Sequence, residues 1–186
     1  ATNEKGLSMA GLNFPGNAHY NKVVEGKDNV ASFELVPWLL GQCATVEEAK
    51  AMLERINITD DAFSKELQPS PLHWMIADKN QTIVFEQTVN GGKIYDNPVG
   101  VMTNNPTFDY HLLHLADYMN ASADVPENKL AKGVQFNAYS RGMGGFGIPG
   151  DLSSASRFVK VAFTKMNSIS GDSESASISQ FFKILG

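Results

Sequence analysis

Three polar side chains in this sequence have the type and the position that acyl-group chemistry requires. Asn13 ends an extended run before a Pro-Gly turn, and Asn104 ends another in MTNNPTFD. Carboxamides at strand ends can direct N–H donors into a cleft, where they would stabilise an oxyanion. Arg157 follows the stretch GMGGFGIPGD and lies near a helix start, where its charge opposes the helix dipole. On the residue types alone, ordinary turns are the favoured explanation.

The glycine-rich stretch suggests a nucleotide site, but its context argues against one. Gly142, Gly144 and Gly147 have the spacing GxGxxG. That motif binds a pyrophosphate when a strand precedes it and a helix follows at once. Here IPGD separates the glycines from the next helix, and Pro149 lacks an N–H donor. We therefore expect a loop that leads to the helix of Arg157.

The remaining chemistry-bearing residues do not form a site by themselves. His111 and His114 are three residues apart, a spacing found in metal sites, but no further ligands accompany them. We therefore predict no metal and no cofactor. Cys43 is the only cysteine, and no histidine is placed to activate it. No GxSxG elbow is present either, so we expect no nucleophile in this chain.

Composition limits the partners of the protein. The 186 residues carry 15 basic and 20 acidic side chains, and no basic stripe could neutralise a phosphate backbone, so nucleic acid is not an expected partner. No apolar run reaches the roughly 18 residues of a membrane span, so no membrane partner is expected. Hydrophobic residues make up 42%, as in globular proteins. The length predicts a single domain over residues 1–186.

Strands are expected mainly in the middle of the chain and helices on both sides, which predicts the α+β class. Residues 6–13 have the pattern of a strand. Four further β-rich runs predict an antiparallel meander over residues 72–78, 82–88, 93–97 and 99–104. Helices are predicted near 33–42, from the capping box Thr45/Glu48 onward, and over 109–119, 154–166 and 174–185. In the last helix we expect a buried stripe made by Ile178, Phe181, Phe182 and Leu185.

Four stretches resemble the choloylglycine hydrolase family, which includes bile salt hydrolases and penicillin V acylases. They are NEKGLSMAGLNFPGNA, PLHWMIAD, VMTNNPTFDYH and GMGGFGIPGDLSSASRFVKVAFTK. They extend over essentially the whole chain and are most similar to bile salt hydrolases of lactobacilli and enterococci. The resemblance implies an N-terminal nucleophile hydrolase fold, an αββα sandwich, of which residues 1–186 are a central part, incomplete at both ends. It also implies a homotetramer of the full-length protein in the bacterial cytoplasm.

The resemblance gives roles to the three polar residues. Asn104 and Asn13 match the oxyanion-hole positions, and Arg157 matches the active-site arginine. Asparagine at the position of Asn13 is typical of bile salt hydrolases, whereas penicillin V acylases carry tyrosine there. The implied reaction is hydrolysis of the amide bond between a bile acid and glycine or taurine. Because the family's nucleophile is an N-terminal cysteine and this chain begins with Ala1, we expect the chain alone to be inactive.

The steroid part of a conjugated bile salt needs an apolar wall. We predict that the loop before the meander supplies part of it, through Phe63, Leu67 and Leu72. Two alternatives stay open at this point. The chain could come from a penicillin V acylase, or it could be a non-catalytic bile-acid-binding module that never had the cysteine.

Overall fold

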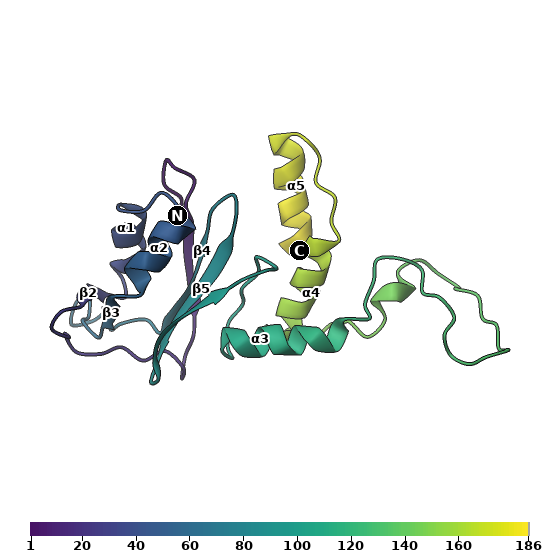
Figure 1. Cartoon of the computed structure of the whole chain (residues 1–186), viewed down its shortest axis with the longest axis horizontal. Helices are drawn as coiled ribbons and strands as arrows, with labels where there is room; N and C mark the ends of the chain where they lie inside the picture. The colour runs from purple at the N-terminus through teal and green to yellow at the C-terminus, as the bar shows by residue number, and fades with distance from the viewer. Residues whose placement is uncertain (186) are drawn as a thin grey trace. The chain divides into compact units, whose positions relative to one another are not determined.

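A four-stranded antiparallel sheet organises residues 1–110 (Figure 1). This computed structural model describes residues 1–185, which form two compact units divided after residue 110. The pairing confirms three of the four predicted meander runs, and the α+β class is confirmed. In spatial order the strands are β1 (Ser8–Asn13), β4 (Leu72–Ala77), β5 (Thr82–Thr88) and β6 (Gly91–Asp96).

The fourth predicted run, residues 99–104, is a loop, so that prediction is wrong. Asn97 organises this loop, because its side chain accepts the Gly100 N–H and donates to the Val101 oxygen, both at 2.9 Å. Such local side-chain bonds compete with a strand ladder. Residues 101–103 are nevertheless buried, which explains why their pattern resembles that of a strand.

The apolar core lies on one face of the sheet. The register pairs Trp74 with Phe85, and both side chains are almost fully buried on this face. Two short helices pack against it, α1 (Leu35–Leu40) and α2 (Val46–Leu53), as Figure 1 shows. Strand alternation leaves the neighbouring residues of β4 and β5 on the opposite face.

The start of α2 is held by two sets of bonds. The predicted cap at Thr45 is confirmed, because Thr45 Oγ1 accepts the Glu48 N–H at 3.3 Å. The Glu48 carboxylate accepts the N–H of Ala44 at 2.6 Å, one residue before the N-cap that a capping box would use. Asp78, in the turn after β4, accepts the Val46 N–H at 2.8 Å. This bond is the main reason why the pKa of Asp78 is lowered from its ordinary value. Asp78 therefore connects the sheet to the helix that covers it.

Sequence analysis missed a parallel pair of short strands, β2 (Asp28–Ala31) and β3 (Ile56–Thr59). Each has four residues, which is too short for a periodic pattern to distinguish strand from helix. Ile56 also continues the helical spacing of the apolar residues Met52 and Leu53, so the pattern favours an extension of the helix over a strand. Gln87 of β5 holds β3 by accepting the Ile58 N–H at 2.9 Å.

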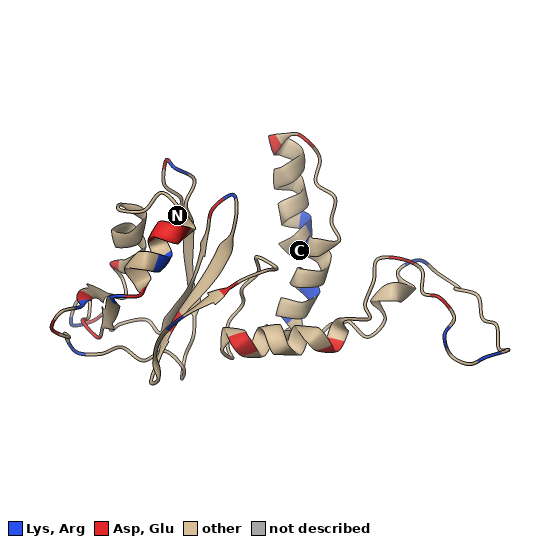
Figure 2. Cartoon of the chain, in the orientation of Figure 1, with Lys and Arg blue, Asp and Glu red and all other residues tan. Residues whose placement is uncertain are grey.

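Residues after 110 form mainly helices and loops. The helical elements are α3 (Phe108–Leu115), the 3-10 helices η1 (Ala116–Tyr118) and η2 (Met143–Gly145), α4 (Ser154–Met166) and α5 (Glu174–Leu185). The predicted bounds of the last two helices are confirmed, whereas the predicted helix 109–119 divides into α3 and η1. Acidic and basic residues are interspersed along the chain (Figure 2). Within residues 1–185 no helix is both long and apolar enough to cross a membrane.

The predicted buried stripe of α5 is wrong. Ser173 caps this helix, since its hydroxyl accepts the Ala176 N–H at 3.2 Å. Within residues 1–185, however, the stripe stays uncovered. The exposed fractions are 50% for Ile178, 57% for Phe181, 67% for Phe182 and 60% for Leu185. An amphipathic pattern identifies a face that needs a cover, but it does not say that the cover lies in the same stretch of chain.

Candidate active site

The structure brings Asn13 and Asn104 into contact, although they are 91 positions apart. Asn13 is the last residue of β1 and is exposed, and Asn104 follows the buried residues 101–103. The Asn104 carboxamide nitrogen Nδ2 donates to the backbone oxygen of Asn13 at 2.9 Å. The neighbouring Asn105 donates to the Pro15 oxygen at 2.6 Å. The two predicted oxyanion-hole positions therefore form one group, joined through the backbone of Asn13.

A fully buried pair, His73 and Glu86, lies next to this group. His73 Nδ1 is 3.0 Å from Glu86 Oε1, and His73 Nε2 is 2.9 Å from the Thr103 oxygen. The Phe14 ring stacks on the imidazole with the ring centroids 4.3 Å apart. Sequence analysis missed this pair. The available signal was a single histidine in the apolar run PLHWMIAD and a single glutamate in TIVFEQT.

Arg157 lies in the first turn of α4, in the second unit, where its Nε donates to the Leu152 oxygen at 3.1 Å. Ser153 caps the helix by accepting the Ser156 N–H at 3.3 Å. Asp151 accepts the Ser156 hydroxyl at 2.6 Å and the Ser153 N–H at 2.9 Å. These serine bonds lower the pKa of Asp151 to about 2. The anionic Asp151 offsets the unfavourable position of the guanidinium at a helix start.

The glycine-rich stretch before α4 has a structural explanation at Gly144. A Cβ at this position would collide with the backbone oxygens of Ser122 and Asp124. The Gly144 oxygen in turn accepts the Ser122 N–H at 2.9 Å. The glycine thus permits two loop segments to approach closely.

The two asparagines are described in the first unit and Arg157 in the second, so convergence of the three on one cavity stays a prediction.

The predicted substrate wall divides into two kinds of residue. Phe63 and Leu67 are mostly exposed on the loop 60–71. The ring of Phe63 packs edge to face against that of Phe33, with the ring centroids 5.2 Å apart. Leu72, by contrast, is the first residue of β4 and packs partly buried against the core. The loop therefore presents apolar side chains to solvent, as a wall for a hydrophobic ligand would require.

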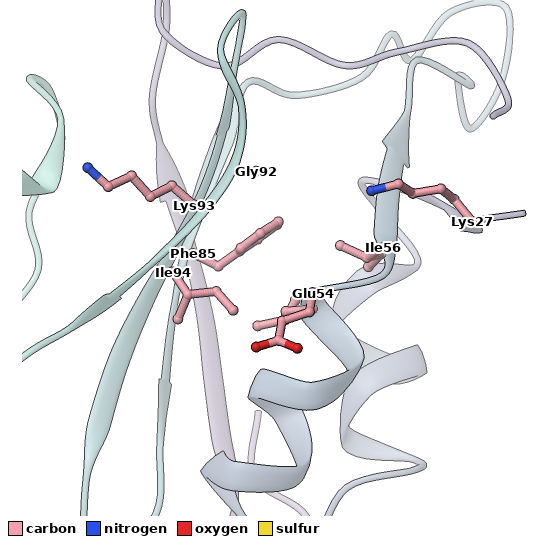
Figure 3. Close-up of a pocket in the computed structure, with 8 residues that line it drawn as sticks. Lys27, Glu54, Ile56, Phe85, Gly92, Lys93 and Ile94 are labelled. Carbon is pink, nitrogen blue, oxygen red and sulfur yellow. The ribbon is translucent and has the colours of Figure 1, made fainter.

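The first unit has a pocket of about 340 Å³ between α2, β3 and the strands β5 and β6 (Figure 3). Phe85 and Ile94 project into it from the sheet. Because side chains alternate along β5, this pocket opens on the face opposite to Glu86. None of the predicted site residues lines it. Its lining comprises Lys27, Leu53, Glu54, Ile56, Phe85, Gly92, Lys93 and Ile94.

The other candidate chemistry has structural roles. Burial raises the pKa of the Cys43 thiol, which disfavours the reactive thiolate. Its sulfur lies 3.3 Å from that of Met52. His111 is buried and stacks on the Phe158 ring with centroids 4.8 Å apart. Among residues 1–185, no group of His, Cys, Asp and Glu side chains is arranged to hold a metal ion.

Comparisons with known proteins identify the family. Residues 1–186 match the linear amide C-N hydrolases, choloylglycine hydrolase family. The bile salt hydrolase/transferase of Lactiplantibacillus plantarum is 55% identical over 186 residues, which are 100% of this chain and 57% of that protein. The bile salt hydrolase/transferase of Clostridium perfringens is 42% identical and is covered to 56%. The chain thus spans a little over half the length of these relatives.

Solved structures agree with this assignment. A crystal structure of a variant of the conjugated bile acid hydrolase from Clostridium perfringens has a TM-score of 0.87 at 42% identity, covering 99% of this chain and 57% of that chain. The structure of penicillin V acylase from Agrobacterium tumefaciens has a TM-score of 0.71 at 22% identity. The match covers 99% of this chain and 50% of that chain, so the two share the fold. The chain belongs to the choloylglycine hydrolase family of linear amide C-N hydrolases.

Proposed function

We propose that these residues are the central part of a conjugated bile salt hydrolase, which cleaves the amide bond between a bile acid and glycine or taurine. The observation that carries the proposal is the 2.9 Å contact between Asn104 and the end of β1 at Asn13. It occurs in a chain that is 55% identical to a bile salt hydrolase/transferase. Asparagine rather than tyrosine at position 13 favours bile salts over penicillin V.

The proposed reaction is acyl transfer through a thioester. The thiolate of an N-terminal cysteine, which would lie outside these 186 residues, attacks the amide carbonyl carbon and forms a C–S bond. The carbonyl electrons move to oxygen, and this oxyanion accepts hydrogen bonds from Asn104 and Asn13. The C–N bond then breaks, and the amine of glycine or taurine leaves with the proton held by the cysteine α-amino group. Water hydrolyses the thioester and releases the bile acid.

Two further parts of the chain would support this reaction. Arg157 would stabilise the thiolate by its positive charge. The loop with Phe63, Leu67 and Leu72 would supply an apolar wall for the steroid body. In the same proposal the longer protein is an αββα sandwich of a single domain, and it assembles as a homotetramer in the bacterial cytoplasm.

Substrate assays of the longer protein test the proposal. We expect release of glycine from glycocholate, with a kcat/KM at least about tenfold higher than that for phenoxymethylpenicillin. We expect no glycine release from the purified 186-residue chain, because it would lack the nucleophile. A preference for phenoxymethylpenicillin would instead identify an acylase. Binding of glycocholate without turnover would identify a binding module.

A further inference from the structure

The His73 ring contacts the residue next to each site asparagine. Phe14, which follows Asn13, stacks on the imidazole with the planes only 7° apart. Thr103, which precedes Asn104, has its carbonyl oxygen 2.9 Å from His73 Nε2. One buried side chain therefore holds both segments that carry the proposed oxyanion-hole residues.

The bonding partners define the protons of His73. A carbonyl oxygen can only accept, so Nε2 carries the hydrogen that it donates to Thr103. On the other side of the ring, Nδ1 lies 3.0 Å from Glu86 Oε1, within hydrogen-bond distance. Glu86 Oε1 also accepts the Phe108 N–H at 3.0 Å. Glu86 thus fixes the ring so that Nε2–H points at the Thr103 carbonyl.

Stability alone does not explain a polar pair at this place. His73 and Glu86 are both 0% exposed and sit opposite each other on β4 and β5. Replacing a buried ionic pair by apolar residues of similar size is often neutral or stabilising. What an apolar pair cannot provide is a directional bond to the backbone beside Asn104.

We infer that His73, held by Glu86, is a positioning residue that keeps Asn104 and Asn13 in the geometry needed to stabilise the oxyanion. The inference rests on the proposed function. His73 does not touch the substrate but acts through Thr103 and Phe14. A misplacement of about 1 Å at a reacting centre can reduce the rate about 100-fold, so loss of this bond should be visible in kcat.

Two matched double variants of the longer protein test the inference. Glu86→Gln is made in both, because it removes the charge that any change of His73 would leave buried. His73→Phe keeps a ring against Phe14 but removes the donor to Thr103. His73→Gln carries an amide N–H at the same number of bonds from the backbone as Nε2 and so keeps that donor. The two variants differ in both contacts of His73: the phenylalanine keeps the ring against Phe14 and lacks the donor, whereas the glutamine keeps the donor to Thr103 and lacks the ring.

We expect the phenylalanine double variant to lose about 10- to 100-fold in kcat on glycocholate, with KM changed less than about threefold. The glutamine double variant should stay within about fivefold of the wild-type kcat. The phenylalanine variant should also be the less stable of the two, because it leaves the buried Thr103 carbonyl without its donor, so kcat is compared under conditions in which both variants are folded. Gln87, next to Glu86 on β5, provides a control. Gln87→Leu breaks its buried bonds to the Ile58 backbone on β3, and it should lower the melting temperature but not kcat.

The outcomes separate this inference from the proposed function. A wild-type longer protein without bile salt hydrolysis overturns both. An active wild type with equal kcat values in the two double variants overturns the inference alone. If the variants do not fold, nitrogen-15 NMR of the wild-type protein decides, since we expect a protonated Nε2 on His73. An unprotonated Nε2 would exclude the bond to Thr103 and overturn the inference.

Discussion

Residues 1–110 and residues 111–185 use apolar side chains in opposite ways. In the first unit the sheet and two short helices enclose a continuous core, in which Phe85 is almost fully buried. In the second unit α4 buries Phe158, but α5 leaves Phe182 mostly exposed. The chain spans 57% of the length of its Lactiplantibacillus relative, and the described residues leave this face of α5 uncovered.

The largest effect that tests this comparison concerns two phenylalanines. In the 186-residue chain, Phe85→Ala should cost about 3–5 kcal/mol of unfolding free energy, because it leaves a cavity in a closed core. Phe182→Ala should change the unfolding free energy by less than about 0.5 kcal/mol, because the ring is exposed. Urea unfolding followed by tryptophan fluorescence measures both changes in unfolding free energy. Trp74 is a suitable probe because its ring centroid lies 6.1 Å from that of Phe85.

The same pair of variants sharpens the comparison in the longer protein. If residues outside this chain cover α5, the cost of Phe182→Ala should rise there to about 2 kcal/mol or more, while that of Phe85→Ala should stay unchanged. Equal costs for the two variants in the 186-residue chain would contradict the contrast between the units. Such a result would mean that the α5 face is already covered, for example by self-association.

The next effect concerns the candidate site in the first unit. In the longer protein, Asn104→Ala should lower kcat about 100- to 1000-fold on glycocholate, because one oxyanion donor and the bond to Asn13 are lost together. Asn90→Ala, in the turn between β5 and β6, is the matched control and should leave kcat unchanged. A loss below about tenfold for Asn104→Ala would remove this residue from the proposed oxyanion hole.

Features defined within a few residues were predictable from the sequence. The starts of α2 and α5 follow from Thr45 and Ser173, whose side chains accept N–H groups three residues ahead. The bounds of α4 were also predicted correctly, and its start is defined locally, because Ser153 caps it. Short β-rich runs separated by turn residues also located β4 and β5, which are six and seven residues long.

Features that depend on distant partners were not predictable from the sequence. The strand character of β3 depends on Gln87, which is 29 positions from Ile58. The contact of Asn104 with Asn13 spans 91 positions, so the pairing of these residues came from the family resemblance and not from a local pattern. His73 was overlooked because its role appears only when Thr103, 30 positions away, is placed beside it.

The smallest expected effect is a pH dependence of stability at two aspartates, each of which accepts N–H groups near a helix start. Asp78 links the sheet to α2, whereas Asp151 acts only on the first turn of its own helix, α4. The folded-state pKa of each is lowered, to about 2 for Asp151. A lowered pKa means that the stabilisation is fully present above the unfolded pKa of about 3.9 and is lost as the pH falls through the folded value.

We therefore expect the first turn of α4 to fray between about pH 4 and pH 2, and Asp151→Asn to remove this pH dependence. The chemical shift of the Ser156 amide, followed by NMR against pH, measures it. Asp78→Asn should instead reduce the pH dependence of global unfolding, because Asp78 joins α2 to the core. If global unfolding followed Asp151 and not Asp78, α4 would unfold together with the sheet, and the two regions would not differ in the way that their exposed side chains indicate.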